Sequence, residues 1–274
     1  MKFLYRFKII AFIASLIFIS ALATLAHDYF LLPADFYLKK GDNLKVALMV
    51  GDELKGLEER KYQSSMTKSF SLRTGKKPVD FLAISTDSMA PIVTYKTTES
   101  GLHLLEMSRN YASITLKKED FLNYLVEEGL LKIQDSLIKS PRLSFTEKYT
   151  RYLKTLVSVD KPTGGVYNEK VGHQLEIMLD NNPYKLNYGD DLSATILFKD
   201  KPLKNATAEL VVKSGDGKVH VTKVNSDVNG KVYFKVNREG TYLLRLVYMQ
   251  ACKDKSADFE SWWASYSFAY KLNI

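Results

Sequence analysis

The chain has very little cysteine and histidine. One cysteine and four histidines occur among its 274 residues. Cys252 therefore has no partner for an internal disulfide, and its distance from the N-terminal segment excludes the acylated cysteine of a lipoprotein. The histidines do not lie in His-Glu-x-x-His or Cys-x-x-Cys spacing. Any metal site must therefore be assembled by the fold from distant parts of the chain.

Catalytic and nucleic-acid motifs are also missing. The sequence has no Gly-x-Ser-x-Gly elbow and no glycine-rich phosphate loop after a strand, and no histidine lies near Cys252. The formal net charge is +8, but acidic residues are interspersed with the basic ones throughout. This distribution is not the footprint of a nucleic-acid-binding protein. We predict that the chain is not an enzyme and does not bind nucleic acid.

The N-terminal segment has the three parts of a secretory signal peptide: basic residues, an apolar run over 9–22 and small residues before position 27. Two cleavage sites fit, one after Ala23 and one after Ala26. The alternative is an uncleaved anchor, because 9–26 is near the lower length limit for a membrane helix. We expect cleavage at 26, export to the periplasm or beyond, no lipid anchor and no remaining membrane span.

The mature sequence favours β-structure. Hydrophobic residues make up 46% of the chain and aromatic residues 12%. Apolar residues alternate over 43–50 after a Gly-Asp turn at 41–42, and the same pattern recurs over 192–198 after Gly189-Asp190. The repeated pattern favours two β-sandwich modules of related design. Short strands and turns over 166–274 then predict an immunoglobulin-like sandwich, with a last strand at 263–272.

A helical insert is predicted at about 117–157. Apolar residues in 117–131 have helical spacing, and Gly129 marks an end or a kink. Ser144 to Glu147 matches a capping box, and apolar residues then recur every three or four positions to 156, which predicts a second helix. Adjacent Glu127 and Glu128 are interpreted as a solvated helix end. A linker at 161–165 divides the N-terminal module, 27–160, from the C-terminal one, 166–274.

Seven short segments, spread in consistent order over the mature chain, resemble the DUF4198 family. They are Ala26-His27-Asp28-Tyr29-Phe30 with Pro33, Phe121 to Leu130, Tyr149 to Lys154, Gly172 to Glu176, Lys201-Pro202-Leu203, Asp227 to Lys231 and Glu260 to Ser265. The resemblance implies an exported bacterial protein, from a group once classed with periplasmic components of nickel and cobalt uptake. One position departs from the family pattern: Gly51 is followed by Asp52 where members often have histidine.

His27 is the best candidate metal ligand. Cleavage after Ala26 would place its free amine and its ring nitrogen on one ion, with Asp28 as a second ligand or an orienting group. His173 and Glu260 are further candidates. A Ni, Co or Cu ion would then be the cofactor or cargo. His103 and His220 lie in alternating strands and are expected to face outward, and Trp262 and Trp263 are expected to anchor a core.

The sequence therefore favours an exported accessory or binding protein that holds a transition metal for uptake. A metal-uptake transporter or an outer-membrane receptor is the expected partner, and the oligomeric state stays open. Two alternatives remain. One is a structural or interaction module of the cell envelope without metal. The other is a copper-dependent oxidoreductase with an N-terminal histidine brace, which needs a second histidine such as His103 or His173.

Overall fold

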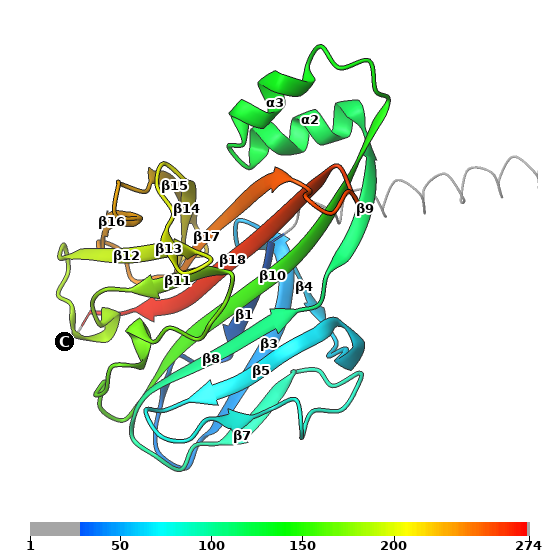
Figure 1. The fold of residues 1–274 in the computed structure, drawn as a ribbon. Helices are drawn as coiled ribbons and strands as arrows, with labels where there is room; N and C mark the ends of the chain where they lie inside the picture. Colours follow the sequence, from blue (N-terminus) through cyan, green and yellow to red (C-terminus); the bar gives the residue numbers. More distant parts are fainter. Residues whose placement is uncertain (1–27, 273–274) are drawn as a thin grey trace, which may run out of the picture.

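The computed structural model describes residues 28–272, which form three layers of β-sheet with two helices at one end (Figure 1). The ten-stranded central sheet has the main order β15-β14-β17-β18-β10-β8-β5-β6, and β2 and β9 also pair with β10. Its strands are β2 (Tyr37–Leu38), β5 (Thr67–Arg73), β6 (Val79–Asp80), β8 (Gly101–Arg109), β9 (Ala112–Lys117), β10 (Ser144–Val159), β14 (Thr207–Ser214), β15 (Val219–Asn225), β17 (Gly240–Ala251) and β18 (Phe259–Tyr270).

The N-terminal outer sheet packs on one face of the central sheet. It contains β1 (Asp28–Pro33), β3 (Asn43–Asp52), β4 (Lys55–Arg60) and β7 (Val93–Lys96), with β3 paired to the other three. Alternate residues of β3, including Leu44, Val46 and Leu48, share a core with Leu153 and Val157 of β10. The alternation predicted over 43–50 is therefore confirmed.

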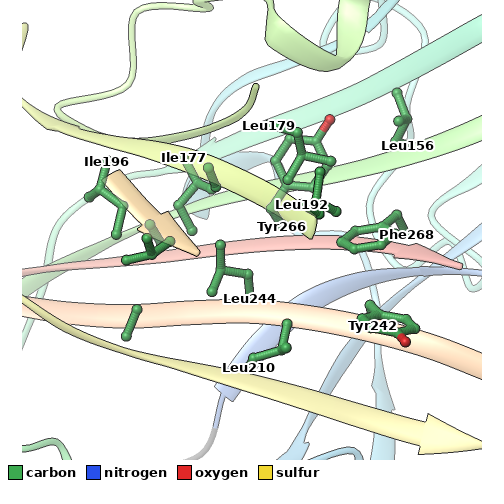
Figure 2. Close-up of a cluster of buried hydrophobic side chains, with 14 of the residues drawn as sticks. Leu156, Ile177, Leu179, Leu192, Ile196, Leu210, Tyr242, Leu244, Tyr266 and Phe268 are labelled. Carbon is green, nitrogen blue, oxygen red and sulfur yellow. The ribbon is translucent and has the colours of Figure 1, made fainter. Parts of the chain in front are cut away.

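The C-terminal outer sheet packs on the opposite face. It contains β11 (Leu175–Leu179), β12 (Asp191–Phe198), β13 (Lys201–Pro202) and β16 (Lys231–Lys235). Ile177 and Ile196 of this sheet face Leu244 and Tyr266 of the central sheet in a continuous apolar core (Figure 2). β12 follows a Gly-Asp turn and pairs with all its sheet neighbours, as β3 does in the other outer sheet. The fold is thus mainly β, with sandwich packing on both faces of the central sheet.

The two sandwiches share the central sheet. β10, which precedes the predicted linker, pairs in parallel with β18, the last strand, from Glu147–Phe259 to Thr155–Ser267. Both strands are buried over most of their length, because an outer layer covers each face. The boundary at 161–165 stays a prediction, and the sheet runs through both predicted modules.

The predicted second helix is wrong. Residues 144–159 form β10, the longest strand described, between β18 on one side and β8 and β9 on the other. Its aromatic and β-branched residues suit a pleated sheet, and pairing on both sides overrides the local capping-box pattern. Glu147, the expected capping residue, is instead buried inside the sheet.

The helical insert is confirmed over a shorter range. It consists of α2 (Lys118–Glu127) and α3 (Leu131–Leu137). Gly129 lies between them with φ +69°, a left-handed conformation that suits glycine. Phe121 and Leu125 of α2 pack on Val247 and Trp263 of the central sheet. No helix among residues 28–272 is long and apolar enough to cross a membrane.

Candidate functional site

A cavity of about 670 Å³ lies between α2, the tip of the β3–β4 hairpin and the central sheet. Seven carboxylate and three cationic side chains line it, together with Asn123, aromatic residues and aliphatic residues. We call this cavity the acidic pocket. Its charged and aromatic lining residues are Asp52, Glu53, Asp120, Tyr124, Glu127, Glu128, Glu147, Tyr149, Arg151, Glu209, Lys223, Arg245 and Trp263. Its volume falls in the usual range for a small-molecule site.

One wall of the acidic pocket is built around Arg245 of β17. Its Nη1 donates to Glu128 at 2.7 Å, and its Nη2 lies 2.7 Å from a carboxylate oxygen of Glu209. Its Nε lies 2.9 Å from Oδ2 of Asp28, an ion pair without hydrogen-bond geometry. Lys223 adds a second cation 3.3 Å from Glu209. Three carboxylates thus meet two cations, and one negative charge is in excess if all are ionised.

The excess of carboxylates changes their protonation. Burial raises the pKa of Glu128 to about 7, against the attraction of Arg245. Burial also raises the pKa of Asp28 well above its usual range, and Glu128 and Glu209 add to the rise by repulsion. Protons therefore neutralise part of this wall near neutral pH.

This wall corrects the interpretation of Glu127 and Glu128. Glu127 is exposed, as expected for a solvated helix end, but Glu128 is buried and paired with Arg245. The residue after α2 points toward the sheet because the chain turns at Gly129. Sequence reasoning missed Arg245 of β17 and Glu209 of β14, because no local motif marks either residue and only the folded sheet brings the two side chains together.

Glu147 of β10 is a buried carboxylate at the helix end of the acidic pocket. The residue is 3% exposed, and its Oε1 accepts from the hydroxyls of Tyr124, at 3.1 Å, and Ser261. Trp263 Nε1 in turn donates to the Ser261 hydroxyl at 3.2 Å. Within 28–272 no lysine, arginine or histidine forms an ion pair with Glu147. Burial accordingly raises its pKa.

Arg151, four residues further along β10, is a buried cation at the other end of the pocket. The residue is 8% exposed, and its guanidinium lies over three rings, 4.3 Å from the centre of Tyr29, 4.6 Å from Tyr149 and 5.3 Å from Trp263. Its Nε is buried without a hydrogen-bond partner, and it pairs with no carboxylate among the described residues. Glu147 and Arg151 would have been noticed only if 144–159 had been interpreted as a strand with one face lined by these residues.

A second group of buried ionisable side chains lies against the opposite face of β10, and we call it the closed charge cluster. It consists of Lys154 of β10, Glu176 of β11, Glu106 of β8 and His173, which precedes β11. Lys154 Nζ donates to Glu176 at 2.7 Å and to the carbonyls of Glu169 and Ile177. His173 Nε2 lies 3.0 Å from Glu106. Burial lowers the pKa of His173 below its ordinary value, so its neutral ring donates to the Glu106 carboxylate.

The predicted metal ligands are not brought together by the structure. Asp28 is paired with Arg245 on one side of the central sheet, whereas His173 is bonded to Glu106 on the other. Glu260 lies opposite Lys148 in the sheet, and its negative charge helps to raise the pKa of Tyr111, after the larger effect of burial. His27 lies outside the described residues. No group of three His, Cys, Asp or Glu side chains suited to a metal occurs within 28–272.

Two further expectations concern histidine and tryptophan. His103 was expected to face outward, but it is buried, with Nδ1 3.2 Å from the carbonyl of Gly101. An outer layer covers this face of β8, which the alternation alone did not reveal. Trp262 and Trp263 are both buried, as predicted, and contribute to opposite faces of β18.

Comparison with known proteins identifies one family. The family described as "Domain of unknown function (DUF4198)" matches residues 24–250. No curated protein matches the chain. Among solved structures, the D0-D1 domain of intimin is similar at 12% identity over 89% of this chain and 98% of that one, with a TM-score of 0.23. A tetra-tandem repeat from the extending region of a large adhesion protein is similar at 10% identity over 88% of this chain and 49% of that one, with a TM-score of 0.21.

Proposed function

The chain belongs to the DUF4198 family, and we propose that it is an exported, non-catalytic binding protein of the cell envelope whose small ligand occupies the acidic pocket. The observation that carries the proposal is the pocket itself: a cavity of about 670 Å³ into which buried charged groups project. Burying charge without full compensation is costly, and such groups gather at functional sites.

The position of the pocket suits a ligand-binding site. Its floor is the central sheet, and one wall is the short α2 helix, packed on the sheet through Phe121 and Leu125. Side chains carried by strands and helices hold a ligand more precisely than side chains on loops.

A ligand screen tests this proposal. The full chain would be expressed with its N-terminal segment and purified from the periplasmic fraction, and thermal shift and calorimetry would measure binding of metal ions, amines, amino acids and short peptides. The variant Asn123→Trp places a large ring at the exposed, pocket-lining position on α2. Val126→Trp is the matched control, because Val126 is exposed on the same helix and does not line the pocket.

We expect Asn123→Trp to weaken binding at least tenfold and Val126→Trp to leave it unchanged. Equal binding by both variants and the wild type would place the ligand elsewhere. Absence of any ligand from the screen would favour the alternative of a structural module of the envelope.

Transition-metal binding is a second candidate, and one observation favours it. Asp28, the residue after His27, is paired with Arg245, which lines the acidic pocket. In the sheet it is opposite Gly51, next to the pocket-lining Asp52 and Glu53. Cleavage after Ala26 would therefore produce a histidine amine beside a carboxylate-rich edge. The metal version of the proposal uses His27 with these carboxylates and does not involve His173 or Glu260.

N-terminal sequencing and titration test the metal candidate. The purified protein should begin at His27, and Ni²⁺, Co²⁺ or Cu²⁺ should bind the wild type at least tenfold more tightly than His27→Ala. A mature chain that begins at Thr24, or equal binding by both proteins, would remove this candidate. Copper binding with peroxide-dependent turnover would support the oxidoreductase alternative. His103, one of the two histidines considered for the brace, lies opposite Val157 and is therefore about 20 Å along β10 from Arg151, which lines the acidic pocket.

A further inference from the structure

We propose that the acidic pocket recognises a zwitterion whose ammonium group and carboxylate lie several ångströms apart, as in a short linear peptide or an ω-amino acid. Glu147 would bind the ammonium group and Arg151 the carboxylate. The inference rests on the proposed function, since it names the class of ligand for the same pocket.

Both charges project into the pocket from one face of one strand. Glu147, Tyr149 and Arg151 are alternate residues of β10, so their side chains point the same way, and all three line the cavity. The Cα atoms of Glu147 and Arg151 are about 13 Å apart, given the rise of a β-strand. A ligand lying along this strand would therefore have the Glu147 carboxylate near one end and the Arg151 guanidinium near the other.

Neither of the two side chains forms a direct ion pair among the described residues. Glu147 accepts from the hydroxyls of Tyr124 and Ser261, and Arg151 lies over aromatic rings with an unbonded Nε. Arg151 attracts the Glu147 carboxylate without touching it. Glu147 and Arg151 do not form an ion pair with one another in the part of the chain that the structure describes. A buried charge without a hydrogen-bonded partner is destabilising, and a ligand group of opposite charge relieves that cost.

Further charges surround both side chains. Near Arg151, the guanidinium of Arg109 lies 5.5 Å from the centre of the same Tyr29 ring. The carboxylates paired with Arg245 lie further along the sheet on the Arg151 side, because Arg245 is opposite Ser265 of β18. The direct contacts of Glu147 and Arg151, rather than the net charge around them, therefore decide which end of a ligand each would bind.

An aromatic surface lies between the two ends. The Arg151 guanidinium lies over the Trp263 ring, whereas Glu147 lies beyond the indole N–H, through the Ser261 hydroxyl. Tyr124 stacks on Trp263 with ring centres 5.9 Å apart. The two charges of an α-amino acid are too close together to reach both ends, whereas a chain of two to four residues is long enough.

Calorimetry with trialanine and 6-aminohexanoate tests the inference. Each capped form of trialanine removes one charge: N-acetyl-trialanine lacks the ammonium group, and trialanine amide lacks the carboxylate. Alanine is the control with adjacent charges. We expect trialanine to bind at least tenfold more tightly than either capped form and than alanine, and Asn123→Trp to abolish that binding.

Two variants assign each charge of the ligand to its partner. Glu147→Gln keeps the hydrogen bonds of Tyr124 and Ser261, and it should remove the preference for trialanine over its N-acetyl form while keeping the preference over the amide. Arg151→Met should do the reverse. A folding defect would weaken the binding of all the ligands together. It would not remove one of these two preferences while keeping the other.

The outcomes separate this inference from the proposed function. Equal binding of trialanine and both capped forms, still blocked by Asn123→Trp, overturns the zwitterion and leaves a pocket-binding protein. Binding of metal ions or simple amines in the pocket with no zwitterion binding does the same. Zwitterion binding that Asn123→Trp does not affect overturns both proposals.

Discussion

Strand β10 carries buried charges on both of its faces, and the two groups differ in how they are partnered. In the closed charge cluster, Lys154 has three acceptors and the Glu176 carboxylate also accepts from three backbone N–H groups. Glu106 accepts from His173 and from two serines. On the pocket face, neither Glu147 nor Arg151 forms an ion pair with any residue in 28–272.

The difference separates structural charges from charges available to a ligand. In the closed cluster, removing Lys154 would leave the buried Glu176 carboxylate without its cation, and an uncompensated buried charge is costly. The pocket-face charges already lack such partners, and removing either one leaves no new unpaired charge. Substitution should therefore be costly on one face and mild on the other.

The largest expected effect is that of Lys154→Met. It leaves the buried Glu176 carboxylate without its cation, and we expect a loss of about 3–5 kcal/mol in the free energy of unfolding. Arg151→Met, on the opposite face of the same strand, is the matched control and should cost about 1–2 kcal/mol through lost contacts with aromatic rings. Urea unfolding measures both. Equal losses would remove the distinction between the two faces.

Arg245→Met should have the next largest effect, and it should depend on pH. Without the guanidinium, the carboxylates of Asp28, Glu128 and Glu209 repel one another, and protonation relieves that repulsion. We expect a loss of about 3 kcal/mol at pH 8 and a clearly smaller loss at pH 5. Urea unfolding at both pH values checks this, and a loss independent of pH would contradict the assigned role of these carboxylates.

Glu128→Gln should change how the stability of the protein depends on pH. The pKa of Glu128 is about 7 in the folded chain, above its ordinary value, so the folded state binds the proton more tightly. The stability that this proton contributes is present below about pH 4.5 and is lost as pH rises toward 7. Glutamine does not titrate, so the variant should gain about 2 kcal/mol on the wild type between pH 5 and pH 8. If the difference in unfolding free energy between the variant and the wild type were the same at pH 5 and pH 8, the pKa of Glu128 would be ordinary.

His173→Gln should show the smallest change and the opposite pH dependence. Burial lowers the pKa of His173, so the unfolded state binds a proton more tightly and the wild type loses stability as pH falls below about 6.5. Glutamine keeps an N–H donor for Glu106 and does not titrate. Its unfolding free energy should therefore fall less than that of the wild type between pH 7 and pH 5. A steeper fall in the variant would contradict a neutral His173.

The sequence predicts the outer sheets well because their strands alternate. β3 and β12 each have one buried face and one more exposed face, and each follows a Gly-Asp turn. β10 was misinterpreted for the opposite reason: outer layers cover both of its faces, so most of its residues are buried and no alternation remains. Its aromatic spacing then matched a helix, and the sheet partner, β18, is more than one hundred residues away.

The candidate site was largely invisible for the same reason. Glu147 and Arg151 lie on β10, and Arg245 lies on β17, which is also buried on both faces. Charged residues in such strands become recognisable only when the strands are assigned to the middle layer. The sequence did single out Asp28, whose carboxylate lies 2.9 Å from Arg245, but as a metal ligand rather than a partner of arginine.

A crystal structure of the mature protein with trialanine would show whether Glu147 and Arg151 of β10 bind the two ends of one ligand. We expect a peptide in the acidic pocket, with its ammonium group within hydrogen-bond distance of the Glu147 carboxylate and its carboxylate on the Arg151 guanidinium. A peptide bound outside the pocket, or one in the pocket that contacts neither residue, would contradict this expectation.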